Sequence, residues 1–600
     1  MSTQYTKQTA LGCLLVALLL TPAIYKKFGT TDADQRTEAD SGPQPGLLDR
    51  YGFMLHESAH ESGVNFQHQP PAIDKRLEHI GPQIAAMGAS VSVVDFDRDG
   101  WQDFYLTNSG PGTKNQLYHN RQDGTFDEVA EQVGLADLNG AGVGACMGSV
   151  WADIDNDGYE DVLVYRWGKT DLFRNIAGER FQRVSELVEF PAWANIGAAT
   201  WLDYDNDGWI DLLLAGYWPD ETRLEHLEHT RIMPDSFEYA NNGGSKWLLR
   251  NLGDGHFEDV TAAVGLKSQR WTLAVCASDV NQDGFVDLFL ANDYGVSELF
   301  LNEHGETFRE VGKEAGIGYA PKSGMNAAVG DVLNQGQLAI FETNISEEGV
   351  LLQGNNLWIP TDSADCRYLN MASVMGVEQG GWSFGAQFGD LNNDGYLDLY
   401  LTNGYVSGEQ GTSYWYDFSQ ITGGHSKIIS DAVNWPAMRG RSLAGYQSKR
   451  VWLNDGAGRF QEVAQLVGAT DRLDGRAVAL ADLGNRGALD ILVANQRGPA
   501  LLYRNRVDAD QHWLGVELEG RTSNRSGIGA SVRLFWNDQQ QLQEVTAASG
   551  YAAQNQRRLH FGLGSHQKID RLEIRWPSGI QQTIQSPNCD QLLVIQEPQS

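Results

Sequence analysis

The sequence predicts an all-β protein in which a seven-bladed β-propeller is followed by a small β-sandwich. Three observations lead to this fold class. An acidic nine-residue loop recurs seven times along the middle of the chain, short runs of β-forming residues flank it, and the C-terminal part has short strands but no copy of the loop. Self-similarity at a period of about 50 residues is typical of propellers, whose blades are small antiparallel sheets around an axis.

Composition sets the first limits on function. The chain has 600 residues, of which 41% are hydrophobic and 10% aromatic, enough to bury a sizeable core. Its net charge is −33, from 45 basic and 78 acidic residues. A nucleic-acid-binding protein needs a positively charged surface, so we expect no nucleic-acid partner.

The N-terminus has the pattern of an export segment. Lys7 precedes an apolar run over residues 10–25, and a polar stretch over residues 28–47 follows as a linker. We therefore expect residues 1–27 to be a signal peptide or a retained signal anchor, both of which stay open. The protein is then extracytoplasmic: secreted, periplasmic or held by a single N-terminal membrane anchor. The five cysteines show no metal-binding spacing, and the sequence does not pair them.

Five of the seven loops have the pattern D-x-[DN]-x-D-G-x-x-D, and they start at Asp95, Asp153, Asp203, Asp279 and Asp390. Ca²⁺ binds six to eight oxygen atoms, and side chains at positions 1, 3, 5 and 9 with the position-7 carbonyl can supply them. Glycine at position 6 permits the sharp turn. Position 12 is apolar in all five of these copies, which excludes an EF-hand. The sequence therefore predicts about five Ca²⁺ sites.

The predicted calcium ligands occupy the same five positions of each loop. They are Asp95, Asp97, Asp99, Trp101 and Asp103; Asp153, Asp155, Asp157, Tyr159 and Asp161; Asp203, Asp205, Asp207, Trp209 and Asp211; Asp279, Asn281, Asp283, Phe285 and Asp287; and Asp390, Asn392, Asp394, Tyr396 and Asp398.

Two further copies have lost most of their acids, and we expect no calcium there. Residues 331–339 keep only Asp331, and residues 482–490 carry Arg486 at position 5. A guanidinium at this position can neutralise Asp482 and Asp490 in place of a metal.

A second motif indicates how the ring closes. After most loops, a strand ending in Asn is followed by a Gly turn and a Phe segment, but the last unit stops at Asn505 without that segment. Residues 53–64 near the N-terminus have the missing pattern. We therefore expect them to complete the seventh blade, because closure removes exposed sheet edges. This places the propeller at residues 48–506 and a β-domain at 507–600.

These repeats resemble FG-GAP/VCBS repeats, as found in integrin α-subunit propellers. The C-terminal segments 512–515, 523–525, 528–530, 549–551, 559–564 and 574–579 are similar to the ASPIC/UnbV domain. The combination resembles the cartilage acidic protein family and implies an integrin-α-like propeller with an ASPIC/UnbV domain. Asn524, Arg525 and His560 can belong to a site or serve turn and core packing.

Two functional classes remain. The first is a non-catalytic adhesion or ligand-binding module, stabilised by Ca²⁺, with a protein or glycan partner that the sequence does not identify. The alternative is a carbohydrate-active propeller enzyme, of polysaccharide lyase or sugar dehydratase type. Its site would lie in two long insertions, residues 217–246 and 405–449, the first of which contains Glu225 and His229.

No catalytic motif favours the enzyme. Residues 56–60 match the HExxH pattern of zinc proteases, but that pattern needs a stable helix and a third ligand, and glycine- and proline-bearing sequence surrounds it. We interpret the match as coincidental and expect no catalytic residue.

Overall fold

The computed structural model describes residues 46–599 except 349, 363–365 and 423. The predicted signal segment, residues 1–27, and all but the end of the linker lie outside the described residues. Within the described part of the chain, no helix is long and apolar enough to span a membrane. Residues from Leu47 onward form one compact unit.

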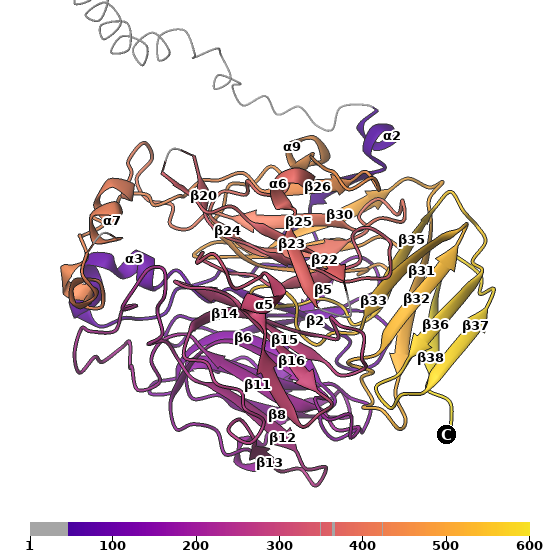
Figure 1. Cartoon of the computed structure of the whole chain (residues 1–600), viewed down its shortest axis with the longest axis horizontal. Coiled ribbons are helices and arrows are strands. Elements are labelled where there is room, and N and C mark those ends of the chain that lie inside the picture. The colour runs from indigo at the N-terminus through magenta and orange to yellow at the C-terminus, as the bar shows by residue number, and fades with distance from the viewer. Residues whose placement is uncertain (1–45, 349, 363–365, 423, 600) are drawn as a thin grey trace, which may run out of the picture. The chain divides into compact units, whose positions relative to one another are not determined.

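Seven groups of four antiparallel strands form the blades; β7 and β10 join those of blades 2 and 3 into one sheet. Figure 1 shows these strands beside the C-terminal ones. Blades 1 to 4 consist of β2 (Ser90–Val94), β3 (Asp103–Thr107), β4 (Gln116–Asn120) and β5 (Phe126–Glu128); β6 (Gly144–Ala152), β7 (Asp161–Gly168), β8 (Asp171–Ile176) and β9 (Arg180–Arg183); β10 (Ala194–Leu202), β11 (Asp211–Gly216), β12 (Lys246–Asn251) and β13 (Phe257–Asp259); and β14 (Trp271–Ser278), β15 (Asp287–Asp293), β16 (Glu298–Glu303) and β17 (Thr307–Glu310).

The remaining blades follow the same order from the axis outward. Blades 5 to 7 consist of β18 (Ala328–Gly330), β19 (Ala339–Glu342), β22 (Asn356–Asp362) and β23 (Arg367–Asn370); β24 (Ser383–Gly389), β25 (Asp398–Asn403), β26 (Arg450–Asn454) and β27 (Phe460–Glu462); and β28 (Gly475–Ala481), β29 (Asp490–Asn495), β30 (Leu501–Val507) and β1 (Phe53–Glu57).

The innermost strands of the seven blades contact one another in cyclic order. Each of β2, β6, β10, β14, β18 and β24 contacts the next, and β28 contacts both β24 and β2. The ring is therefore closed, which confirms the predicted all-β, seven-bladed fold.

Blade 7 combines strands from the two ends of the propeller. β1 pairs antiparallel with β30, with Phe53 opposite Val507 and Glu57 opposite Tyr503. The turn after β1 repeats the turn after β5, since the Val64 amide donates to the Ala59 carbonyl as the Leu135 amide donates to Ala130. The N-terminal segment thus supplies the fourth strand that the last unit lacks, as its sequence pattern predicts.

Aromatic and aliphatic side chains fill the space between blades. Between blades 1 and 2, the buried Trp151 ring packs edge-on against Tyr105 and Phe181, at centroid distances of 5.8 and 5.5 Å. Each blade buries both faces in this way, because its neighbours cover both. The strands β6, β14 and β24 are accordingly buried along their whole length.

The C-terminal part is a sandwich of two sheets, the yellow strands of Figure 1. One sheet contains β31 (His512–Glu519), β35 (Leu559–Gly564) and β38 (Gln591–Gln596). The other contains β32 (Ser531–Trp536), β33 (Gln539–Glu544), β36 (Arg571–Arg575) and β37 (Gln581–Gln585). A further short strand, β34 (Ala553–Gln554), leaves the sandwich and pairs in parallel with β2 of blade 1.

Candidate functional site: the ring of acidic loops

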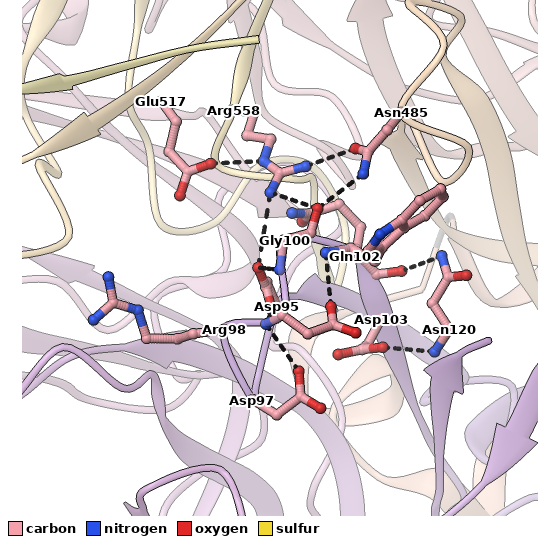
Figure 2. A network of polar contacts seen from close by, with 12 residues as sticks. Asp95, Asp97, Arg98, Gly100, Gln102, Asp103, Asn120, Asn485, Glu517 and Arg558 are labelled. Carbon is pink, nitrogen blue, oxygen red and sulfur yellow. Dashed lines mark hydrogen bonds and ion pairs between the residues drawn. The ribbon is translucent and has the colours of Figure 1, made fainter. Parts of the chain in front are cut away.

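Each acidic loop joins the inner strand of a blade to its second strand. In blade 1 the Asp95 carboxylate accepts hydrogen bonds from the backbone amides of Asp99 and Gly100, at 3.1 and 3.0 Å (Figure 2). The Asp103 carboxylate accepts from the Asn120 amide at 2.7 Å. The position-1 and position-9 carboxylates thus shape the turn, and Gly100 adopts a left-handed φ of +88° within it.

The other four complete loops have the same geometry. In each, the position-1 carboxylate accepts from the amides of positions 5 and 6, at 2.6–3.1 Å, and the position-9 carboxylate accepts from an Asn amide on the third strand, at 2.7–3.0 Å. The position-1 acceptors are Asp153, Asp203, Asp279 and Asp390, and the Asn donors are Asn175, Asn251, Asn302 and Asn454.

Carboxylate oxygens converge in three of these loops. Three acid side chains bring one oxygen each within 4.8 Å of one another: Asp95, Asp97 and Asp103; Asp153, Asp155 and Asp161; and Asp203, Asp205 and Asp211. Loops 4 and 6 carry Asn281 and Asn392 at position 3, where an amide oxygen stands in for the third carboxylate. In these three loops the structure therefore brings the predicted side chains of positions 1, 3 and 9 around a common point.

The loops fit a divalent cation on their own chemistry. Burial raises the pKa of Asp153 and of Asp203 to about 7, and the pKa of Asp211 well above the usual range. Oδ1 of Asp205 is buried and has no hydrogen-bond partner among the described residues. Several buried carboxylates with an unused oxygen are costly unless a cation compensates them.

A basic residue on the third strand accompanies each loop that has four aspartates, namely His119, Arg174 or Arg250. His119 lies 3.0 Å from Asp97, Arg174 is paired with Asp155, and Arg250 lies 2.8 Å from Asp205. In loops 4 and 6, where position 3 is Asn, the equivalent strand residues are Leu301 and Leu453. The strand residue thus changes together with the charge of the loop beside it.

The two incomplete loops keep the turn without the acid cluster. Asp331 accepts from the amides of Gln335, Gly336 and Leu542. In the seventh loop Arg486 is ion-paired with Asp490, and Arg504 reaches the same carboxylate at 2.8 Å. An arginine therefore neutralises Asp490, as the sequence predicts, whereas Asp482 accepts backbone amides, of which the Arg486 amide lies at 3.0 Å.

Amide side chains bind neighbouring loops together, a feature that the sequence analysis did not recognise. The Asn251 side chain donates to the Ile154 carbonyl of the preceding blade's loop at 2.8 Å. Position 4 makes a second bridge, since Asn206 donates to the Gly284 carbonyl of the following loop at 2.8 Å. Equivalent position-4 bridges link five other pairs of neighbouring loops; their donors are Asn156, Gln282, Asn334, Asn393 and Asn485.

The C-terminal domain contacts this ring of loops. Arg558, from the start of β35, lies 3.7 Å from Asp95 and donates to the Gly100 carbonyl and to Asn485 (Figure 2). The Arg525 amide donates to Asn156, and Arg575 lies 3.4 Å from Asp279. The domain also reaches loops 5 and 6, since the Leu542 amide donates to Asp331 and His560 Nε2 lies 2.7 Å from Asn393 Oδ1. The domain therefore lies against the acidic face of the propeller.

Of the two alternatives for Asn524, Arg525 and His560, contact with the loops is observed for all three. The Asn524 side chain makes a hydrogen bond to Asp203 of loop 3, and the Arg525 amide donates to Asn156 of loop 2. His560 is buried, its Nε2 lies 2.7 Å from Asn393 Oδ1, and burial lowers its pKa to about 4. Asn524 makes hydrogen bonds to Ile528 within its own turn.

Residues 549–556 of the C-terminal domain run along the propeller axis. Ser549 and Gln387 exchange hydrogen bonds, the Tyr551 amide donates to Asn326, and the Gln554 side chain accepts from the Trp151 amide. These partners belong to blades 6, 5 and 2. The axis of the ring is therefore occupied by a segment that comes from the other domain.

The two insertions meet on the face opposite the acidic loops. Thr230 in the first donates to Asp431 in the second at 2.6 Å, and the Met233 amide donates to the Ser430 carbonyl. Figure 1 shows α7 (Trp415–Thr422) of the second insertion beyond the blades, on the side away from the C-terminal strands. His229 and His425 are exposed.

The HExxH match does not form the element that a zinc protease needs. His56 and Glu57 lie in strand β1, with their side chains on opposite faces, and His60 follows in a turn. His56 is exposed and lies 3.6 Å from the equally exposed Glu61.

The fold and the loop pattern define a propeller built from FG-GAP-like repeats with a terminal ASPIC and UnbV domain. The FG-GAP-like repeat family model matches residues 95–164, 153–214 and 239–290, and the model described as ASPIC and UnbV matches residues 520–600. This combination confirms the resemblance to the cartilage acidic protein family.

The related curated proteins carry that name. Cartilage acidic protein 1 from Homo sapiens is 30% identical over 175 residues, which cover 27% of this chain and 25% of the human protein. The mouse protein is 29% identical over 170 residues, covering 27% and 26%. The matched part thus spans about a quarter of these relatives.

Solved structures with a similar arrangement are distant. The BP39L lectin from Burkholderia pseudomallei gives a TM-score of 0.42 at 12% identity, covering 70% of this chain and 97% of the lectin. A rhamnogalacturonan lyase from Bacillus licheniformis gives 0.34 at 11% identity, covering 75% of each chain.

Proposed function

We propose that this protein is an extracytoplasmic, calcium-binding β-propeller that acts as a non-catalytic ligand-binding or adhesion module. The FG-GAP-like propeller and the ASPIC and UnbV domain support a module of this general kind. The observation that carries the calcium assignment is the convergence of buried and partly buried carboxylate oxygens within 4.8 Å in three loops of one design. The N-terminal apolar run supports export.

Calcium would be held by positions 1, 3, 5 and 9 and by the carbonyl of position 7 of each complete loop. When bound, it would supply the positive charge that these carboxylates lack. The loops connect the two innermost strands of a blade and carry the bridges to neighbouring blades. Fixing them would therefore stiffen the ring, which is the role we assign to the metal.

The experiment is a metal count combined with thermal unfolding in Ca²⁺ and in chelator. We expect about five bound Ca²⁺ ions, because five loops are complete. Each site held at 100 times its Kd adds about 2.7 kcal/mol to the free energy of unfolding, so chelation lowers the melting temperature strongly. The calcium assignment would be contradicted if the chain bound no metal, or if chelation left its melting temperature unchanged.

A matched control separates the metal from general charge effects. Mg²⁺ at the same concentration screens the acidic surface equally, but it prefers a smaller octahedral site with several waters. We expect Mg²⁺ to restore much less of the melting temperature than Ca²⁺ does.

A further inference from the structure

The two insertions and the mouth of the propeller axis enclose a pocket of about 510 Å³. Its floor includes Leu273 of β14 and Phe384 of β24, at the ends of these strands away from the acidic loops. Phe237 from the first insertion and Phe418 from the second lie at its sides. The volume falls in the range of small-molecule sites in proteins, about 300–1,000 Å³.

Two buried polar atoms of the lining are left without partners. Gln83 on α3 (Gly81–Ile84) is 3% exposed, and Trp382 is 6% exposed. Gln83 Oε1 and Trp382 Nε1 have no hydrogen-bond partner among the described residues. One is an acceptor and the other a donor, so a purely apolar occupant would leave both unsatisfied.

The charges around the pocket argue against an anion. None of the described lining residues is Lys, Arg or His, whereas Asp293 and Glu238 are acids. Asp293 is buried and accepts from the Tyr217 hydroxyl at 2.9 Å and from the Tyr294 amide at 3.1 Å. An anionic ligand would therefore contact carboxylates, and no described lining side chain would offer it a positive charge in return.

A cationic ligand is opposed by a positive charge behind the floor. The Arg476 guanidinium is buried, lies 4.0 Å from the centre of the Phe384 ring and donates to the carbonyls of Ala86, Gly404, Gly475 and Tyr405. The Phe384 ring is part of the pocket lining, so the guanidinium lies directly behind the pocket. Burial also raises the pKa of Asp293 to about 7, which reduces its negative charge near neutral pH.

The lining also provides neutral hydrogen-bonding groups beside aromatic surface. Ser236, Ser323 and Gln353 lie with the rings of Phe237 and Tyr294. A saccharide presents hydroxyls at its edge, which polar groups can bind, and C–H groups on its faces, which can pack against aromatic rings.

We infer that this pocket binds a neutral saccharide of about one or two sugar units, contacted by Gln83 and Trp382. The inference rests on the proposed ligand-binding role and names the ligand class and the face that binds it. It does not depend on the calcium assignment.

The test is ligand-observed NMR with the calcium-loaded full chain. The probes are methyl glycosides of neutral hexoses and deoxyhexoses, with galacturonate as the anion and choline as the cation. We expect saturable binding of at least one neutral glycoside at one site per chain, without competition from galacturonate or choline. If no neutral glycoside binds, or if a charged probe binds better, the inference is wrong.

Variants locate the binding. Trp382→Phe removes the N–H and keeps an aromatic ring, and Gln83→Leu removes the amide at similar volume; we expect each to weaken binding roughly tenfold. The matched control is Trp536→Phe in the C-terminal domain, whose buried Nε1 is also unpartnered but lies outside the pocket. Equal effects of Trp382→Phe and Trp536→Phe would overturn the assignment of the site.

A blocking variant covers the case in which a buried substitution unfolds the protein. Glu238→Trp places a large ring at an exposed position of the lining, and we expect it to abolish binding. A normal melting temperature and calcium count in the same sample would show that the fold and the proposed metal role are intact. Loss of calcium binding with retained saccharide binding would contradict the proposed function and leave this inference standing.

Discussion

Replacing Asn251 tests whether the amide bridges hold the blades together. The side chain is 1% exposed and makes three hydrogen bonds: its Nδ2 donates to the carbonyls of Ile154 (2.8 Å) and Ile210 (3.2 Å), and its Oδ1 accepts from the Gly253 amide (3.0 Å). Asn251→Ala leaves two carbonyls and one amide without partners. At about 1 kcal/mol for each bond, the free energy of unfolding falls by about 3 kcal/mol.

Asn251→Asp sharpens this test. The aspartate has the same shape, but it places a carboxylate oxygen where Nδ2 faced two carbonyl oxygens, and the buried Asp211 carboxylate already accepts from the backbone amide of the same residue. We therefore expect Asn251→Asp to destabilise the protein more than Asn251→Ala does.

Urea unfolding in saturating Ca²⁺, followed by tryptophan fluorescence, measures both variants. The control is Asn65→Ala, because Asn65 is exposed and its side chain donates only to Gly63 at 3.3 Å; a change within about 0.5 kcal/mol is expected. A loss below 1 kcal/mol for Asn251→Ala, or an aspartate variant as stable as the alanine variant, would refute the reasoning.

Two further predictions concern charge. Asp205→Asn alone leaves Arg250 beside Asp207 and weakens calcium binding to loop 3, whereas Asp205→Asn with Arg250→Leu reproduces the pattern of loops 4 and 6 and regains part of the affinity. Calorimetric titration measures the coupling free energy between the two changes, which we expect at about 1 kcal/mol because Arg250 is 37% exposed. Additive effects of the two single changes would argue against charge balancing. Burial lowers the pKa of His68 from 6.5 to about 3, so the unfolded chain binds the proton first and stability falls as pH drops below 6.5. His68→Gln should therefore lose about 2.3 kcal/mol less than the wild type between pH 6.5 and 4.5, and parallel pH profiles of the two proteins would contradict this.

Much of the fold could be predicted because its signals are local and repeated. The recurrence of the acidic loop indicates seven units. The last unit lacks a Phe segment after Asn505, and residues 53–64 have the pattern of the missing segment. The third-strand Asn also appears in the repeat, but a single sequence does not show that its side chain crosses to the preceding blade, since that contact depends on how blades pack.

The position of the C-terminal domain could not be predicted for a related reason. Arg558 and Gln554 lie outside the repeats, and no repeated motif indicates that Arg558 contacts a loop of blade 1 and Gln554 a strand of blade 2. Likewise, the insertions could be recognised from their lengths, but the contact of Thr230 with Asp431 joins segments that differ in sequence and length. Contacts between non-repeating parts leave no pattern for a sequence to display.

The way blade 7 is assembled has a consequence for the order of folding. Blades 1 to 6 each draw their strands from one continuous stretch, so each can form as soon as that stretch has been synthesised. β1 is made first of the strands in the described part of the chain, yet its partner β30 is made some 450 residues later. Until then β1 has no strand partner and β2 lacks its contact with β28, so the nascent chain carries exposed strand edges at its leading end for most of its synthesis. Truncation before Leu501 would therefore release both ends of the ring together, and the propeller would be lost as a unit rather than shortened by one blade.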